Sequence, residues 1–425
     1  MRYNLFCENA HIRNDAKLML LVMSTLICLC LLVFADVIGR KKLMKIASVL
    51  VLTGITTAAI MPEFQQRMFG LGLVSGGEGA FSALFTIYIN ENTTRQTKLR
   101  SSLVSISFLA YALGCIALNG IAYLTMNPHY LMLFTAGFLC CSVLPAFWTY
   151  YETPYFLYKK GRVSELFTTL MAIYKYNQGK HGVDETLMIG VENKLLEDLG
   201  FSSHITHKAF FKTSTIVLEK KKTEDYQSNN AVLQLCTNKR NLVHMLGLIL
   251  IGGFQYCLFY GMSINIDSLG LKDIKLNGML LGVTQAIGYI AVIPFTHRMK
   301  RRWWSLTFQG VLLLGALVLL MLSKQEQTSQ ILFTQSLVST LLMASVMSAL
   351  FPLFFIYITE AFPTEVRGTA NALVLFSAKL IGSASPLLLQ LSQDLGVHVL
   401  VGCALIGTLS FPLTFCMKET LGSKE

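Results

Sequence analysis

Long apolar runs are the feature that most restricts what this chain can fold into. A helix that spans a membrane needs about 17–25 mostly apolar residues, and the sequence contains eleven runs of roughly this length or longer. All of them exceed strand length, so each is predicted to be a helix rather than a barrel strand. The run at 330–359 is longer than one span requires and contains Pro352, so it is expected to begin or end outside the hydrocarbon. The runs cover residues 18–35, 43–62, 68–90, 102–125, 130–150, 242–266, 277–296, 304–323, 330–359, 369–392 and 395–416.

The composition excludes several classes of protein. Hydrophobic residues make up 53% of the chain and charged residues 14%, against about 25% charged in a soluble domain. No nucleic-acid partner is expected despite the net charge of +11, because the basic residues lie in short gaps between apolar runs. Eight of the ten cysteines lie in or beside these runs without a CxxC pair, so neither disulfides nor a metal site is predicted. We find no nucleophile–base spacing or phosphate loop, and we expect no enzyme activity and no cofactor.

Basic residues alternate strongly between the loops. One set of loops carries 27 of the 35 Lys and Arg residues, thirteen of them within 151–240, and the other set carries seven. Basic loops stay on the side from which a chain inserts, so the N-terminus is predicted outside and the C-terminus inside. The sequon at Asn92 then lies on the inner side, where it should stay unglycosylated.

The two ends of the chain repeat one pattern. Tyr-x-x-Glu followed by an arginine occurs twice, and so does a basic turn after an apolar run, with offsets of 269 and 261 residues. The repeat divides the chain into a first half at 1–150 with five spans, an inner-face linker with short helices at 151–240, and a second half at 241–425 with six spans. The run 242–266 has no counterpart in the first half.

Several motifs in this order are similar to those of the major facilitator superfamily, specifically the organic cation/anion/carnitine transporters and their sugar-porter relatives. They lie at residues 3–9, 36–41, 67–78, 152–162, 259–263 and 357–368. The resemblance implies an all-α integral membrane bundle of two pseudo-symmetric halves with about eleven transmembrane helices, one fewer than the family's twelve.

The resemblance also implies that charges at the inner face act as a conformational latch. Arg40 is expected to pair with Glu91, and Arg367 with Glu360, while Asp36 lies near the helix that begins at 369. The alternative is that these charges only set topology and form solvated ion pairs of little energy. The expected latch residues are Asp36, Gly39, Arg40, Glu91, Arg100, Glu152, Arg162, Glu360 and Arg367.

Few ionisable residues lie within the apolar runs, and such residues are functional candidates. The family has a charged residue at the position of Lys379, and a basic one implies a substrate with a carboxylate. A pair with Glu78, or snorkelling to an interface, is the alternative for Lys379. The helix at 242–266 is expected to line the cavity, although an aromatic stripe is more often packing. The expected substrate-binding residues are Lys379, Gln255, Tyr256, Phe259, Tyr260 and Glu78.

Two functions compete on this basis. The first is a secondary transporter of small organic ions, with a preference for carboxylate-bearing or zwitterionic ones. The second is a non-transporting subunit of a membrane complex, in which another chain or a lipid fills the groove of the missing helix. A start assigned too late in the sequence would also account for that helix. Membrane lipid surrounds the protein in every case, and the resemblance implies the plasma membrane, with the mitochondrial inner membrane as alternative.

Overall fold

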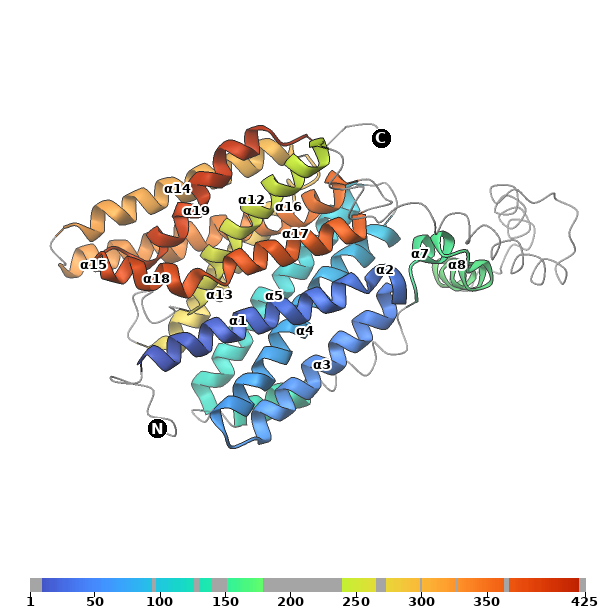
Figure 1. The fold of residues 1–425 in the computed structure, drawn as a ribbon, viewed down its shortest axis with the longest axis horizontal. Helices are drawn as coiled ribbons and strands as arrows, with labels where there is room; N and C mark the ends of the chain where they lie inside the picture. Colours follow the sequence, from blue (N-terminus) through green and yellow to red (C-terminus); the bar gives the residue numbers. More distant parts are fainter. Residues whose placement is uncertain are drawn as a thin grey trace, which may run out of the picture.

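A computed structural model describes residues 10–93, 97–125, 130–138, 151–178, 239–264, 273–298, 300–325, 328–362 and 367–419. Helices dominate the described residues, and they form one elongated bundle (Figure 1). The first half consists of α1 (Ala10–Val33), α2 (Ala35–Ile38), α3 (Arg40–Ile60), α4 (Phe64–Asn92), α5 (Thr97–Thr125) and a helical segment at 130–138.

Within the first half, α4 packs against both α1 and α3. Helices α3 and α4 approach closely at Gly54 and Gly70, where a Cβ on either residue would lie 2.6 Å from the other's carbonyl oxygen. Small residues let two helices approach closely in lipid, where apolar burial adds no driving force. The glycine-rich start of α4 therefore brings its remaining length close to α3.

The second half contains α12 (Lys239–Ile264), α13 (Ile274–Val292), α14 (Arg301–Ser323), α15 (Ser329–Leu337), a π-helical turn at Val338–Ala344, α16 (Ser345–Ala361), α17 (Arg367–Gly382), α18 (Ser385–Asp394) and α19 (Val399–Phe415). Helix α12 packs against α17 and α19. The two halves meet where α5 packs against α13 and where α1 packs against α17 (Figure 1).

Part of the linker is helical. Helix α7 (Pro154–Lys159) begins after Thr153, whose hydroxyl accepts a hydrogen bond from the backbone N–H of Phe156 at 3.4 Å. Helix α8 (Val163–Gln178) follows, which confirms the helical spacing at 163–176. Both lie beyond the end of the bundle that carries α2 (Figure 1). The second expected linker helix, at 184–199, falls outside the described residues.

Eight helical segments of the described residues are long and apolar enough to cross a membrane. Helices α13 and α19 and the segment 130–138 lie in the three other predicted runs, so the count of eleven stays a prediction. The longest segment, Ser329–Ala361, has 33 residues. At about 1.5 Å per residue it exceeds a hydrocarbon core of about 30 Å, which agrees with the expectation for this run.

Candidate functional site

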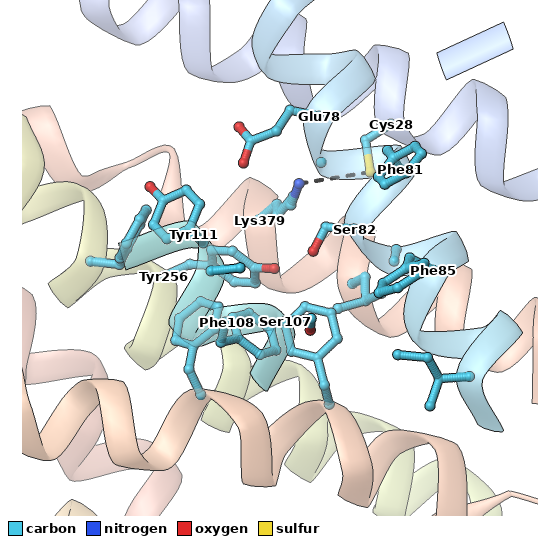
Figure 2. A pocket seen from close by; sticks show the side chains of 18 of the residues that line it. Cys28, Glu78, Phe81, Ser82, Phe85, Ser107, Phe108, Tyr111, Tyr256 and Lys379 are labelled. Atoms are coloured by element: carbon cyan, nitrogen blue, oxygen red, sulfur yellow. Dashed lines mark hydrogen bonds between the residues drawn. The ribbon is translucent and has the colours of Figure 1, made fainter. Parts of the chain in front are cut away.

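A cavity of about 940 Å³ lies between the two halves. Its wall is largely apolar, and α1, α4 and α5 from the first half face α12, α13, α16 and α17 from the second. Figure 2 shows the labelled side chains converging on this space. Five of the six expected substrate-binding residues line it, namely Glu78, Tyr256, Phe259, Tyr260 and Lys379.

Gln255 does not lie with the other five. Its side chain is fully buried, it is not part of the cavity wall, and both of its amide atoms lack a hydrogen-bond partner among the described residues. Helix α12 turns Tyr256, Phe259, Tyr260 and Ser263 toward the cavity. These positions have the i, i+3, i+4, i+7 spacing of one helix face, and residue 255 falls on the adjacent face.

Two opposite charges line the cavity without forming a direct pair. Lys379 is 7% exposed, and its ammonium lies 3.8 Å from Cys28 Sγ and 5.8 Å from the ring centre of Tyr256. The carboxylate of Glu78 forms no hydrogen bond or ion pair with any side chain in the described part of the chain. Figure 2 shows Glu78 and Lys379 facing the same space. The expected alternative of a Glu78–Lys379 contact pair is therefore not formed here.

The backbone around Lys379 explains its position. Lys379 lies in the last turn of α17, and its carbonyl accepts a hydrogen bond from Ser383 N at 2.8 Å. The helix is interrupted there and resumes as α18, with Pro386 in its first turn. Proline lacks an N–H donor and is tolerated at the start of a helix, so a break just before it is favourable.

Aromatic rings form much of the cavity wall. Tyr256 packs against Tyr260 and Phe351 with ring centres 5.8 and 5.2 Å apart, and Phe108 packs against Phe355 at 5.1 Å. Tyr111 lies near Phe259 at 6.2 Å. An apolar organic ligand can pack against such a wall, and a cation can lie over the faces of its rings. Phe259 was expected here, whereas Phe108, Tyr111, Phe351 and Phe355 were not, because apolar runs contain aromatics on every face.

The charged residues of the first half gather at the end of the bundle that carries α2. We call it the basic end, because Arg40 and the lysines at 41 and 42 follow α2 there. Arg40 is 5% exposed and binds Glu91 at 2.8 Å, as expected, and its Nη1 donates to Ala35 O at 3.1 Å. Glu152 accepts from the backbone N–H of Arg40 at 3.0 Å and so caps the start of α3. Gly39 has a φ of 107°, and a Cβ there would collide with the Glu152 carboxylate.

An equivalent cluster occurs in the second half. Arg301 is 1% exposed, its Nε lies 3.2 Å from Glu360, and its guanidinium also donates to Thr296 O. Glu419 accepts from the backbone N–H of Arg301 at 2.8 Å. Glu360 therefore pairs with Arg301, and the expected pair of Glu360 with Arg367 stays a prediction because the side chain of Arg367 lies outside the described residues. The repeat of Glu-Thr at 152 and 419 could have identified Glu419 from the sequence.

The remaining latch candidates differ in position. Arg100 of α5 pairs with Glu360 of α16 at 2.5 Å and thereby connects the two halves. Arg162 pairs with Glu165 three residues later, and both are exposed, so this pair is local. The side chains of Asp36 and Arg367 lie outside the described residues. Helix α2, which contains Asp36, packs against α17, which begins at Arg367.

Comparison with known proteins gives two kinds of likeness. Human solute carrier family 22 member 16 is 25% identical over 406 residues, which cover 92% of this chain and 62% of that protein. The chain thus spans less than two thirds of the length of this relative. The matched proteins are transporters by name, which agrees with the expectation that the chain is not an enzyme.

Solved structures share the fold. The proton:xylose symporter XylE from E. coli has a TM-score of 0.68 at 16% identity, covering 94% of this chain and 84% of the symporter. The human organic anion transporter MFSD10 has a TM-score of 0.59 at 15% identity, covering 94% and 83%. The family profile described as Major Facilitator Superfamily matches residues 18–386. The chain belongs to the major facilitator superfamily.

Proposed function

We propose that this protein is a secondary transporter of small organic solutes that carry a carboxylate, either as anions or as zwitterions. The observation that carries the proposal is the Lys379 ammonium on the wall of a largely apolar cavity between the two halves. The superfamily match and the solute-carrier relatives support transport as the activity.

Charge complementarity supports the substrate class. An ammonium within a membrane costs about 2.5–3.5 kcal/mol at the centre of a helix, so it is retained where it has a partner or a function. A ligand carboxylate would supply a partner of opposite charge, and charge-assisted hydrogen bonds are about twice as strong as neutral ones. Glu78 in the same cavity disfavours dianions and favours a ligand with a cationic group as well.

The contacts at the basic end support alternating access. Arg100 and Glu360 belong to opposite halves, and each pairing with Glu91 or Glu360 ties helix ends together. We infer that these contacts hold the basic end closed and break when the cavity opens there, as a two-state element. Asp36, Gly39, Glu152 and Arg367 belong to the same proposed latch, and Arg162 stays a weaker candidate.

The test uses the full chain reconstituted into liposomes. We expect saturable uptake of 3-phenylpropionate or phenylalanine and little uptake of phenethylamine. Lys379→Ala should bind the carboxylates roughly ten- to a hundredfold more weakly, as expected for loss of a hydrogen bond to a charged group. Lys379→Asp should weaken carboxylate binding and admit the amine. Lys324→Ala, an exposed lysine far from the cavity, is the matched control. Equal carboxylate binding by wild type and Lys379→Ala would overturn the role of Lys379.

A non-transporting subunit is the second candidate. Gly114 and Gly120 of α5 face open space, since a Cβ on either would meet no atom within 4 Å in the described residues. Helices α5 and α17 occupy the same place in the two halves, because each follows the Tyr-x-x-Glu motif of its half. Helix α12 packs against α17, and among the described residues we find no first-half helix that packs against α5 in the equivalent way. We propose that a lipid or another chain fills this groove. Robust, saturable uptake by the lone chain would refute the subunit function.

A further inference from the structure

Lys379 forms a contact between the two halves at the wall of the cavity. It belongs to α17 of the second half, but its ammonium lies against α4 and α1 of the first half. Its Sγ neighbour on α1 is Cys28, which is fully buried. Helices α1 and α17 already pack against each other, so the lysine adds a polar contact to an existing boundary between the halves.

Gly79 makes this position possible. A Cβ on Gly79 would collide with Lys379 Nζ, and the next heavy atom near that Cβ position is Lys379 Cε at 3.5 Å. No side chain larger than hydrogen therefore fits at residue 79 while the ammonium stays in place. Gly79 and Cys28 together form a seat for the ammonium, which we call the lysine seat.

The lysine seat holds the ammonium only weakly. A thiol and a glycine backbone carry no net charge, and Glu78 lies beyond ion-pair distance of Lys379. A substrate carboxylate offers the ammonium a charge-assisted hydrogen bond, which is stronger than a contact with a neutral sulfur. Cys28, Gly79 and Lys379 all line the cavity, so a ligand carboxylate can approach the ammonium from the cavity side and compete with its contact to Cys28.

We propose that the lysine seat is a tether between the halves that a substrate carboxylate replaces. In the empty protein Lys379 joins α17 to α1 and α4, and an arriving carboxylate withdraws the ammonium and frees the halves to rock. The proposal rests on the proposed function of Lys379 as the carboxylate-binding residue. A ligand shifts a conformational equilibrium only by its differential affinity for the two states, and exchange of the seat for the ligand supplies that difference.

The first test needs no substrate. Alkylation of Cys28 by N-ethylmaleimide is followed by peptide mass spectrometry in the reconstituted full chain. A cysteine attacks as its thiolate, and the ammonium beside Cys28 stabilises that form. Gly79→Ala displaces the ammonium and places a methyl group 3.8 Å from Cys28 Sγ, so Cys28 should react roughly tenfold more slowly, the factor that corresponds to about 1.4 kcal/mol. Gly310→Ala is the matched control, because a Cβ there only reaches ordinary contact with Phe411 at 3.7 Å. Should Gly79→Ala fail to fold, Lys379→Ala removes the same ammonium and should also slow the reaction.

The second test measures the tether. The tether should slow the change of the empty transporter from its inward-open to its outward-open state. Unlabelled 3-phenylpropionate inside the liposomes releases the tether, so it should stimulate uptake of the labelled compound by wild type. Gly79→Ala should lose most of this stimulation while its half-saturating concentration changes less than about threefold, and Gly310→Ala should keep it. Equal Cys28 reactivity in wild type, Gly79→Ala and Lys379→Ala would overturn the seat. Undiminished stimulation in Gly79→Ala would overturn the tether. Absence of any carboxylate uptake would instead refute the proposed function, and the Cys28 result would still decide the seat.

Discussion

Arg100 on α5 and Glu360 on α16 join the two halves at the basic end of the bundle, with 2.5 Å between Nη2 and Oε1. Glu360 also binds Arg301 of its own half at 3.2 Å. One carboxylate therefore belongs both to the cluster that organises its own half and to the contact between halves. Arg100 is 21% exposed and Arg301 is 1% exposed, so the two arginines should differ in what they contribute.

Arg301→Ala should destabilise the protein more than Arg100→Ala. Removing Arg301 breaks a fully buried ion pair and leaves Glu360 with the more exposed Arg100 alone, which costs about 3–5 kcal/mol. Removing Arg100 leaves Glu360 paired with Arg301, and we expect a loss of about 1 kcal/mol. Thermal unfolding in detergent measures both, and Arg162→Ala, in an exposed pair, is the control with almost no effect. A larger loss for Arg100→Ala would contradict this order.

Gly39→Ala should be strongly destabilising. The φ of 107° at this residue disfavours any side chain, and a Cβ would collide with the Glu152 carboxylate that caps α3. We expect a loss of about 2–4 kcal/mol from strain together with the displaced cap. Gly120→Ala, whose new methyl group would meet no atom of the described residues within 4 Å, should cost nothing by comparison. A midpoint of thermal unfolding that is the same for both variants would be inconsistent with this account.

Stability should decrease as the pH is lowered, because of His398. Its Nδ1 accepts a hydrogen bond from Leu400 N at 3.3 Å at the start of α19, and burial lowers its pKa from 6.5 to about 4. The unfolded chain therefore binds more protons than the folded one between these values, so stability rises with pH across that window. It should be intact above about pH 6.5 and decline by up to about 3 kcal/mol toward pH 4.

His398→Asn keeps a cap and cannot titrate there. Its midpoint of thermal unfolding should therefore change less than that of wild type between about pH 7, above the titration range of His398, and about pH 5, within it. An identical pH dependence in both proteins would exclude His398 as the titrating group.

The membrane orientation is open to a direct test. The distribution of Lys and Arg predicts the N-terminus outside and residues 151–240 and the C-terminus inside. A cysteine placed within 221–230 should react with a membrane-impermeant reagent only after permeabilisation, and Asn92 should stay unglycosylated in a secretory-pathway host. Glycosylation at Asn92, or labelling in intact cells, would reverse the orientation. Fluorescence of a tagged chain decides between the plasma membrane and an organelle.

Local patterns were sufficient for part of the site. The repeated Tyr-x-x-Glu motif indicated the positions of Glu91 and Glu360, and a lone lysine in an apolar run indicated Lys379. Such residues can be recognised from the sequence alone, because ionisable residues are rare in membrane helices. The pair of Arg40 with Glu91 was predicted correctly, because both residues lie at helix ends on the same side within one half.

The amino-acid sequence by itself determined the helical spans and their charge asymmetry, because in a bilayer the length of an apolar run leaves the backbone few alternatives. Only the tertiary structure decided that Glu360 binds Arg301 and Arg100, that Gln255 turns away from the cavity, and that Gly79 makes room for Lys379. An apolar helix has no polar face to indicate its rotation, and partners 260 residues apart along the chain, such as Arg100 and Glu360, are set by how the halves dock.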